Sequence, residues 1–293
     1  MRTKTLAIAL LVPALIVTAC GRLNDAGDGG SGGTGGTGGI DHPTGADQLV
    51  LRVATGGGFV PVEYNLRALP GFSLFGDGRL IVEGPMIEIY PGPALPNLQV
   101  SQLTEDGIQA ILEAAREAGL LGPDKSYDYP CVTDLPTTTF TVAGDGGTHT
   151  VSAYALGFEG EDMGRCGDVD VEARTALLDF SQKLGDLRSW LPQGSVGPEE
   201  SFTPTEMRVY VQPYRGDPQL EQPPADWPLA GSLDAFGEPD PNLAEIRCGV
   251  VGGADLEVLL PEAQSANQLT PWISDGVEHG LIFRPLLPDE HAC

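Results

Sequence analysis

The acidic segment EGEDMGRCGDVD at residues 159–170 contains the densest group of side chains that could hold a metal ion. Carboxylate oxygens are hard ligands of the type that Ca²⁺ binds. The candidate ligands are Glu159, Glu161, Asp162, Asp168 and Asp170. Their spacing does not follow the EF-hand pattern of alternating acidic residues, a central glycine and a distant glutamate. The favoured alternative is a solvated loop in which Asp170 caps the helix that follows.

Side chains for nucleophilic or acid–base catalysis are scarce. The histidines are His42 near the N-terminus, His149 in a predicted hairpin, His279 in a predicted strand and His291 beside the C-terminus. The patterns H-E-x-x-H, P-loop and C-x-x-C do not occur in the sequence, and G-x-S-x-G occurs only at residues 29–33 of the glycine-rich segment, where no strand or helix is predicted to hold a nucleophile. A catalytic triad is assembled in space, so the missing motifs lower the expectation of an enzyme without excluding one. We favour a protein that is not an enzyme and that carries no cofactor.

Aromatic side chains among turn residues are candidates for a binding surface. Tyr127 lies in KSYDYPC, Trp227 in PADWPL and Trp272 in LTPWISDG. Exposed aromatic side chains on loops often contribute to recognition. A buried aromatic that anchors a loop gives the same sequence pattern, so both interpretations stay open.

Residues 47–192 predict an antiparallel sheet covered on one face by two helices. Strands are predicted at 48–55 and 59–69, and hairpins at 72–84 and 137–156, which turn at Gly76–Gly78 and Asp145–Gly147. The helices are predicted at 105–118 and at about 171–185. Thr104 is the expected N-cap of the first helix, and Gly119 follows its end. Strands joined by short turns, together with two helices, indicate the α+β class.

Residues 205–293 predict a second, smaller and mostly β unit, separated from the first by a linker at 193–204. Its strands are predicted at 206–214, 245–252 and 277–287. Residues 254–268 predict one or two short helices that Pro261 interrupts, and 213–242 predict a long loop rich in proline and glycine.

The N-terminus has the order of features that directs a protein out of the cytoplasm. Arg2 and Lys4 precede an apolar stretch from Leu6 to Val17, which is too short to span a bilayer. Small residues then lead into a cysteine, and Val17-Thr18-Ala19-Cys20 resembles the lipobox of bacterial lipoproteins. The resemblance implies that residues 1–19 are a signal peptide and that the Cys20 sulfur receives a diacylglycerol. It implies an extracytoplasmic protein anchored in the bacterial membrane by lipid.

The remaining cysteines are expected to form disulfides, because an even number outside the cytoplasm favours pairing. They are Cys131, Cys166, Cys248 and Cys293, which allow three pairings. We favour Cys131–Cys166 and Cys248–Cys293, since each pair then lies on one side of the proline- and glycine-rich stretch. The alternative, in which the thiols bind a metal, is disfavoured because the spacings do not suit zinc.

Charge and composition complete the functional prediction. Residues 20–46, the acylated cysteine and a glycine-rich segment, are expected to form a disordered tether because they have little to bury. The formal net charge of −25 repels phosphate backbones, so nucleic acid is not an expected partner. The expected partners are the lipid bilayer, through Cys20, and a protein of the cell envelope. The sequence therefore predicts a membrane-anchored binding module of unknown ligand. The alternatives are an envelope hydrolase that uses carboxylates and Ca²⁺, and an inhibitor of secreted proteases.

Overall fold

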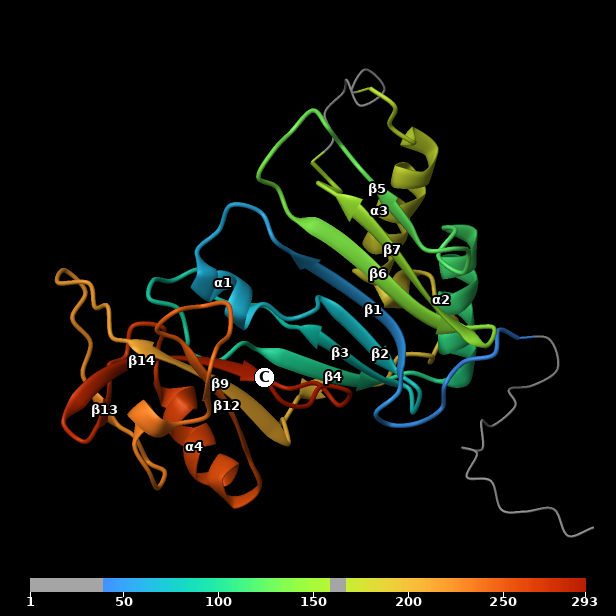
Figure 1. The fold of residues 1–293 in the computed structure, drawn as a ribbon. Helices are drawn as coiled ribbons and strands as arrows, with labels where there is room; N and C mark the ends of the chain where they lie inside the picture. The colour runs from blue at the N-terminus through green and yellow to red at the C-terminus, as the bar shows by residue number, and fades with distance from the viewer. Residues whose placement is uncertain (1–38, 159–166) are drawn as a thin grey trace, which may run out of the picture. The chain divides into compact units, whose positions relative to one another are not determined.

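Two β-sheets form the framework of the chain in the computed structural model, which describes residues 39–158 and 167–293 (Figure 1). The first sheet has eight strands in the order β5-β7-β6-β1-β2-β3-β4-β8. They are β1 (Leu49–Gly56), β2 (Phe72–Phe75), β3 (Arg79–Glu83), β4 (Leu98–Gln102), β5 (Lys125–Tyr127), β6 (Thr137–Gly144), β7 (Gly147–Tyr154) and β8 (Glu200–Ser201). Neighbouring strands are antiparallel except β5 and β7, which run parallel. Both predicted hairpins are present, as β2–β3 and β6–β7.

Helices α2 (Glu105–Glu117) and α3 (Val171–Leu184) lie on one face of the first sheet (Figure 1). Side chains alternate between the two faces of a strand, so every second residue of β1, β6 and β7 points toward the helices. Val53, Phe140 and Val151 lie opposite one another in neighbouring strands and are buried beneath α2 and α3. The ring of Phe140 lies 6.1 Å from that of Phe180 on α3. The main hydrophobic core therefore lies between this sheet face and the two helices.

The ends of α2 follow from local sequence. The Thr104 hydroxyl accepts a hydrogen bond from the Gly107 N–H at 3.4 Å, which satisfies one of the amides that an α-helix leaves unpaired at its start. At the other end, Gly119 has a φ of 78°, a left-handed conformation that suits glycine. The following Leu120 N–H donates to the Ala115 carbonyl at 2.9 Å. Both ends of the helix lie where the sequence predicts them.

The opposite face of the first sheet is divided into an apolar and a polar part. On β2, β3 and β4, the side chains of Phe75, Ile81 and Leu98 are covered by Leu287 from the C-terminal tail, residues 286–293. On β1 and β6 this face carries polar side chains, among them Arg52 and Thr141, which lie opposite each other. The C-terminal tail therefore replaces a helix layer over the apolar part.

The second sheet has six strands in the order β10-β13-β14-β9-β12-β11. They are β9 (Glu206–Pro213), β10 (Ala225–Asp226), β11 (Glu238–Pro239), β12 (Arg247–Gly252), β13 (Trp272–Ser274) and β14 (Val277–Pro285). Helix α4 (Gly253–Ser265) packs on this sheet, with Leu259 buried against the rings of Trp272 and Phe283. With the short helix α1 (Val62–Arg67) and 3₁₀ turns at Leu187–Ser189 and Leu233–Ala235, this completes an α+β fold. The predicted fold class is confirmed.

The structure corrects three local predictions. Residues 62–67 within the predicted strand 59–69 form helix α1. Helix α4 continues past Pro261, and the burial of Leu259 and Ala263 on either side of it stabilises the unbroken helix. Residues 39–46, the last part of the expected tether, pack on the folded body: Ile40 is 2 % exposed, and its N–H and carbonyl both bond to the Gln109 side chain. Hydrogen bonds from the Asp145 N–H to the Asp41 carbonyl and from Arg79 to the Ala46 carbonyl add to this packing.

The predicted signal peptide, Cys20 and residues 20–38 of the predicted tether lie outside the described residues. Within the described ranges, no helix has the length and apolar character needed to cross a membrane.

We expect Thr104→Ala to lower the free energy of unfolding by about 1 kcal/mol, because one amide at the start of α2 loses its partner. Chemical denaturation followed by circular dichroism measures the change. Thr104→Ser keeps the hydroxyl and should stay close to the wild type. Equal stability of the alanine variant and the wild type would contradict the capping role.

Candidate functional site

A cavity with a volume of about 1160 Å³ opens at one end of the first sheet. It lies where β1, β3 and β4 end or begin, beside the segment 67–72 and the C-terminal end of α3. We call it the sheet-end groove. Strands β1 and β3 end here, and β2 and β4 begin here, so no further strand residues fill the space.

The floor of the sheet-end groove is apolar and joins the two sheets. Val53, Leu80 and Leu184 come from the main core, and Phe283 comes from β14 of the second sheet. Leu95 and Gln268 extend the wall on the side of the second sheet. Ligand sites occur preferentially at such junctions, with an apolar lining and a few polar groups.

Exposed apolar side chains occur on two segments that contribute residues to the groove lining. Tyr64 on α1 and Met86 after β3 both line it, and Ile87, Ile89 and Tyr90 follow in the same segment. We call these five residues the apolar rim. Four of them, all except Met86, are 57–68 % exposed. Large exposed apolar groups that cluster beside a cavity mark interaction surfaces, whereas single exposed ones do not.

Both signs of charge are present in the groove. Burial raises the pKa of the Glu83 carboxyl above its ordinary value, because the concave position removes part of its water. Burial likewise lowers the pKa of the Arg67 guanidinium, while the charge of Glu63, one helical turn earlier, acts in the opposite direction. Glu88, Asp186, Arg188 and Glu199 complete the ionisable lining.

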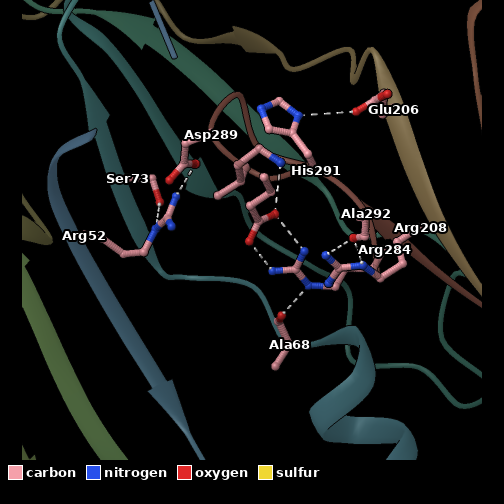
Figure 2. Close-up of polar contacts among 11 residues, drawn as sticks. Arg52, Ala68, Ser73, Glu206, Arg208, Arg284, Asp289, His291 and Ala292 are labelled. Carbon is pink, nitrogen blue, oxygen red and sulfur yellow. Dashed lines mark hydrogen bonds and ion pairs between the residues drawn. The ribbon is translucent and has the colours of Figure 1, made fainter. Parts of the chain in front are cut away.

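The C-terminal tail holds the wall of the groove in place (Figure 2). Arg284 on β14 donates from Nε to the carbonyl of Ala68, a groove residue, at 3.0 Å. The same guanidinium donates two bonds of 2.7 and 2.8 Å to the carboxylate of Glu290. Asp289, the next residue back, pairs with Arg52 of the first sheet at 2.7 Å. The tail therefore ties a strand of each sheet to the segment that lines the groove.

A disulfide closes the end of this tail. Cys293 is bonded to Cys248 on β12, as the sequence predicts, and Arg208 on β9 donates two hydrogen bonds to the neighbouring Ala292 carbonyl (Figure 2). Cys131 is also disulfide-bonded, and its predicted partner Cys166 lies outside the described residues.

The predicted calcium ligands are only partly described. Glu159, Glu161 and Asp162 lie outside the described residues, and Asp168 is exposed. Asp170 is the N-cap of α3: its carboxylate accepts from the Ala173 N–H at 3.1 Å and pairs with Lys125 at 3.3 Å. Both contacts lower the pKa of this carboxyl. Within 39–158 and 167–293, no three His, Cys, Asp or Glu residues gather as a metal site would require.

None of the three predicted aromatic candidates lines the groove. Trp272 is 1 % exposed and contacts Phe283 and Trp227 edge to face, with ring centroids 5.4 and 6.4 Å away. It belongs to the core of the second sheet and is not on the surface. Trp227 is partly buried in the same cluster. Tyr127 packs against the main core, and Lys125 lies over its ring at 4.4 Å.

The histidines do not line the groove in the described part of the chain. His42 is buried by the folded body, where Nδ1 lies 2.7 Å from the Pro43 carbonyl and Nε2 lies 3.1 Å from Glu105. His279 is buried on β14, with Nε2 lying 3.8 Å from Asp234. The groove is lined by apolar, amide, hydroxyl and charged side chains, a composition that suits the binding of a ligand.

Sequence reasoning missed the groove residues because it assigned Tyr64 and Arg67 to a strand. The signal for α1 was present: Pro61 immediately precedes the helix, and Glu63 and Arg67 are spaced as an acid–base pair on one helical face.

Comparison of the chain with protein-family models, with curated proteins and with solved structures finds no match.

The Glu290 carboxylate should make stability depend on acid pH. Burial acts to raise its pKa, but the bonds from Arg284 and the Leu287 N–H, with the charges of Arg284 and Arg52, outweigh it and hold the pKa below its ordinary value. A lowered pKa in the folded state contributes stability above the pKa of the unfolded chain, and this contribution is lost as the pH falls through the folded value.

We therefore expect the wild type to lose more unfolding free energy between about pH 5 and pH 3 than Glu290→Gln, which cannot titrate at this position. Denaturant titrations at a series of pH values measure the two slopes. Glu117→Gln on the exposed face of α2 is the matched control. Parallel curves for the wild type and Glu290→Gln would contradict the role of this ion pair.

Proposed function

We propose that this chain is a binding module held on the outer face of a bacterial membrane by a diacylated Cys20. The N-terminal order of positive charge, apolar stretch, small residues and cysteine supports the anchor. Two acyl chains suffice for stable attachment, whereas a single chain binds only marginally. A glycine-rich tether of about 18 residues between Cys20 and Gly39 has a mean reach of roughly 20–25 Å. The body is then held close to the membrane with freedom to turn toward a partner.

The observation that carries the binding role is the apolar rim beside the sheet-end groove. Tyr64 and Met86 line the cavity from two different segments, and the exposed Ile87, Ile89 and Tyr90 follow Met86 in the chain. Exposing such groups to water is unfavourable, and contact with a partner would remove them from it. The groove supplies a concave apolar floor and the rim supplies contact area, which together suit a polypeptide partner of the cell envelope.

Removal of the acceptor thiol tests the anchor. We expect Cys20→Ala to leave the protein unlipidated, so that it is released from membranes or accumulates unprocessed. Fractionation of cells, with detergent partitioning and mass spectrometry of the N-terminal peptide, measures this. Chains that carry Cys131→Ser or Cys248→Ser keep Cys20 and should remain anchored. Firm membrane attachment of Cys20→Ala would refute the lipid anchor.

Capture of a partner tests the binding role. Residues 20–293 with Cys20→Ser are immobilised with their disulfides oxidised and exposed to a solubilised envelope extract, with and without Ca²⁺. We expect a stoichiometric partner whose recovery falls about tenfold or more with Ile87→Ser/Ile89→Ser, because truncated apolar contacts at an interface centre cost at least this much. Val258→Ser/Val277→Ser removes exposed apolar groups elsewhere and should leave recovery unchanged.

Each other result points to a different interpretation. A partner retained equally by both double variants would place the binding surface away from the apolar rim, and the absence of any partner would contradict the proposal. A captured protease would favour the inhibitor alternative. Recovery that depends on Ca²⁺ would return attention to the acidic segment 159–170.

A further inference from the structure

The guanidinium of Arg67 is the exceptional group in the sheet-end groove. Its side chain is half-buried and lines the cavity, yet it makes no hydrogen bond and no ion pair with any described residue. Glu63 lies one turn earlier on α1 and acts on it only through its charge. Removing part of the water from a guanidinium without providing a partner is unfavourable, so such charges are normally paired.

Every other arginine in the described ranges donates a hydrogen bond. They are Arg52, Arg79, Arg116, Arg174, Arg188, Arg208, Arg215, Arg247 and Arg284. The chain has 41 acidic residues against 16 basic ones, so carboxylates are abundant for pairing. Despite this excess of acid, Arg67 is unpaired within the described ranges although it lines the sheet-end groove, so it is available to an anionic group of a ligand.

The surroundings of Arg67 restrict that partner to one kind of anion. Four carboxylates, from Glu83, Glu88, Asp186 and Glu199, line the groove together with Arg67 and Arg188, and Arg188 already donates to two backbone carbonyls, so a ligand with several negative charges would be repelled. A single carboxylate matches the planar donor fork of one guanidinium. The apolar floor formed by Val53, Leu80, Leu184 and Phe283 requires that the rest of the ligand be apolar.

The size and polar lining of the groove favour a peptide over a single acyl chain. Its volume of about 1160 Å³ is above the usual range of roughly 300–1,000 Å³ for small-molecule pockets. Gln268 places an amide on the wall, and an amide can both donate to and accept from a peptide backbone; the neighbouring amides of Asn97 and Gln99 bond to each other at 2.6 Å. The apolar rim continues the contact surface beyond the cavity.

We propose that the sheet-end groove binds the carboxyl-terminal segment of an apolar polypeptide, with the terminal carboxylate paired to Arg67. The acidic lining favours a basic residue further from the end of this segment. The inference rests on the proposed binding function and names the chemistry that the groove recognises.

Matched peptides test the carboxylate directly. The probe is acetyl-Lys-Leu-Val-Leu-Phe with a free carboxyl terminus, and its partner is the same peptide as the C-terminal amide. Isothermal titration calorimetry with residues 20–293 carrying Cys20→Ser measures both affinities. We expect the free acid to bind about tenfold or more tightly than the amide, as one charge-assisted pair supplies.

Variants of Arg67 test whether this residue causes the preference for the free acid over the amide. Arg67→Gln should bring the two affinities to within about twofold, Arg67→Lys should retain part of the preference, and Arg116→Gln on α2 should leave it unchanged. Thermal unfolding of each variant checks that the fold is kept.

Four results would overturn the inference, and they separate it from the proposed function. Equal binding of acid and amide to the wild type refutes the carboxylate contact but leaves a groove that binds peptides. A preference that survives in Arg67→Gln places the carboxylate elsewhere. Dodecanoate that binds more tightly than the peptide acid, with loss in Arg67→Gln, replaces the peptide by an acyl chain. If none of these probes binds, the inference is refuted, and the capture experiment still tests the proposed binding function.

Discussion

The pair between Arg284 and Glu290 is the contact on which the arrangement of the two sheets depends. Arg284 belongs to the second sheet, and its guanidinium bonds at the same time to the tail and to Ala68 beside the first sheet. Both side chains are largely buried, at 9 % and 17 % exposure, so removing either would leave a charge with little water and no partner. The bidentate geometry satisfies the guanidinium fork and fixes its plane.

The position of the groove follows from this junction. The C-terminal tail covers the apolar half of the outer face of the first sheet through Leu287, and the Arg284 bond positions the segment after α1. Strands β1 and β3 end and β2 and β4 begin beside the C-terminal end of α3, and all of these contribute residues to the groove. The two sheets therefore meet over a space that neither fills, and the apolar side chains around it come from both cores. A disulfide from Cys293 to Cys248 holds the tail that completes this arrangement.

The distribution of charge gives the groove its character. A chain with a formal charge of −25 has few cations, and the described arginines serve mainly as structural donors to carbonyls and carboxylates. Arg67 differs from these arginines because it lies on α1 and lines the cavity. The carboxylate of Glu290 in the C-terminal tail bonds to Arg284 instead. The surrounding carboxylates limit the negative charge that a ligand can bring. An apolar ligand with one anionic group satisfies both conditions.

The sequence by itself determined the elements whose ends are set by local chemistry. Thr104 and Gly119 bound α2, Asp170 begins α3, and the glycine turns define both hairpins, because caps and left-handed turns depend on the residues at the turn itself. It also predicted the Cys248–Cys293 bridge from the position of the linker. Tertiary structure alone decided the ordering of Ile40 and the burial of Trp272. These depend on partners far along the chain, such as Gln109 and Phe283, which a local pattern does not contain. The groove belongs to the same class, since its walls come from residues that only the packing of the two sheets brings together.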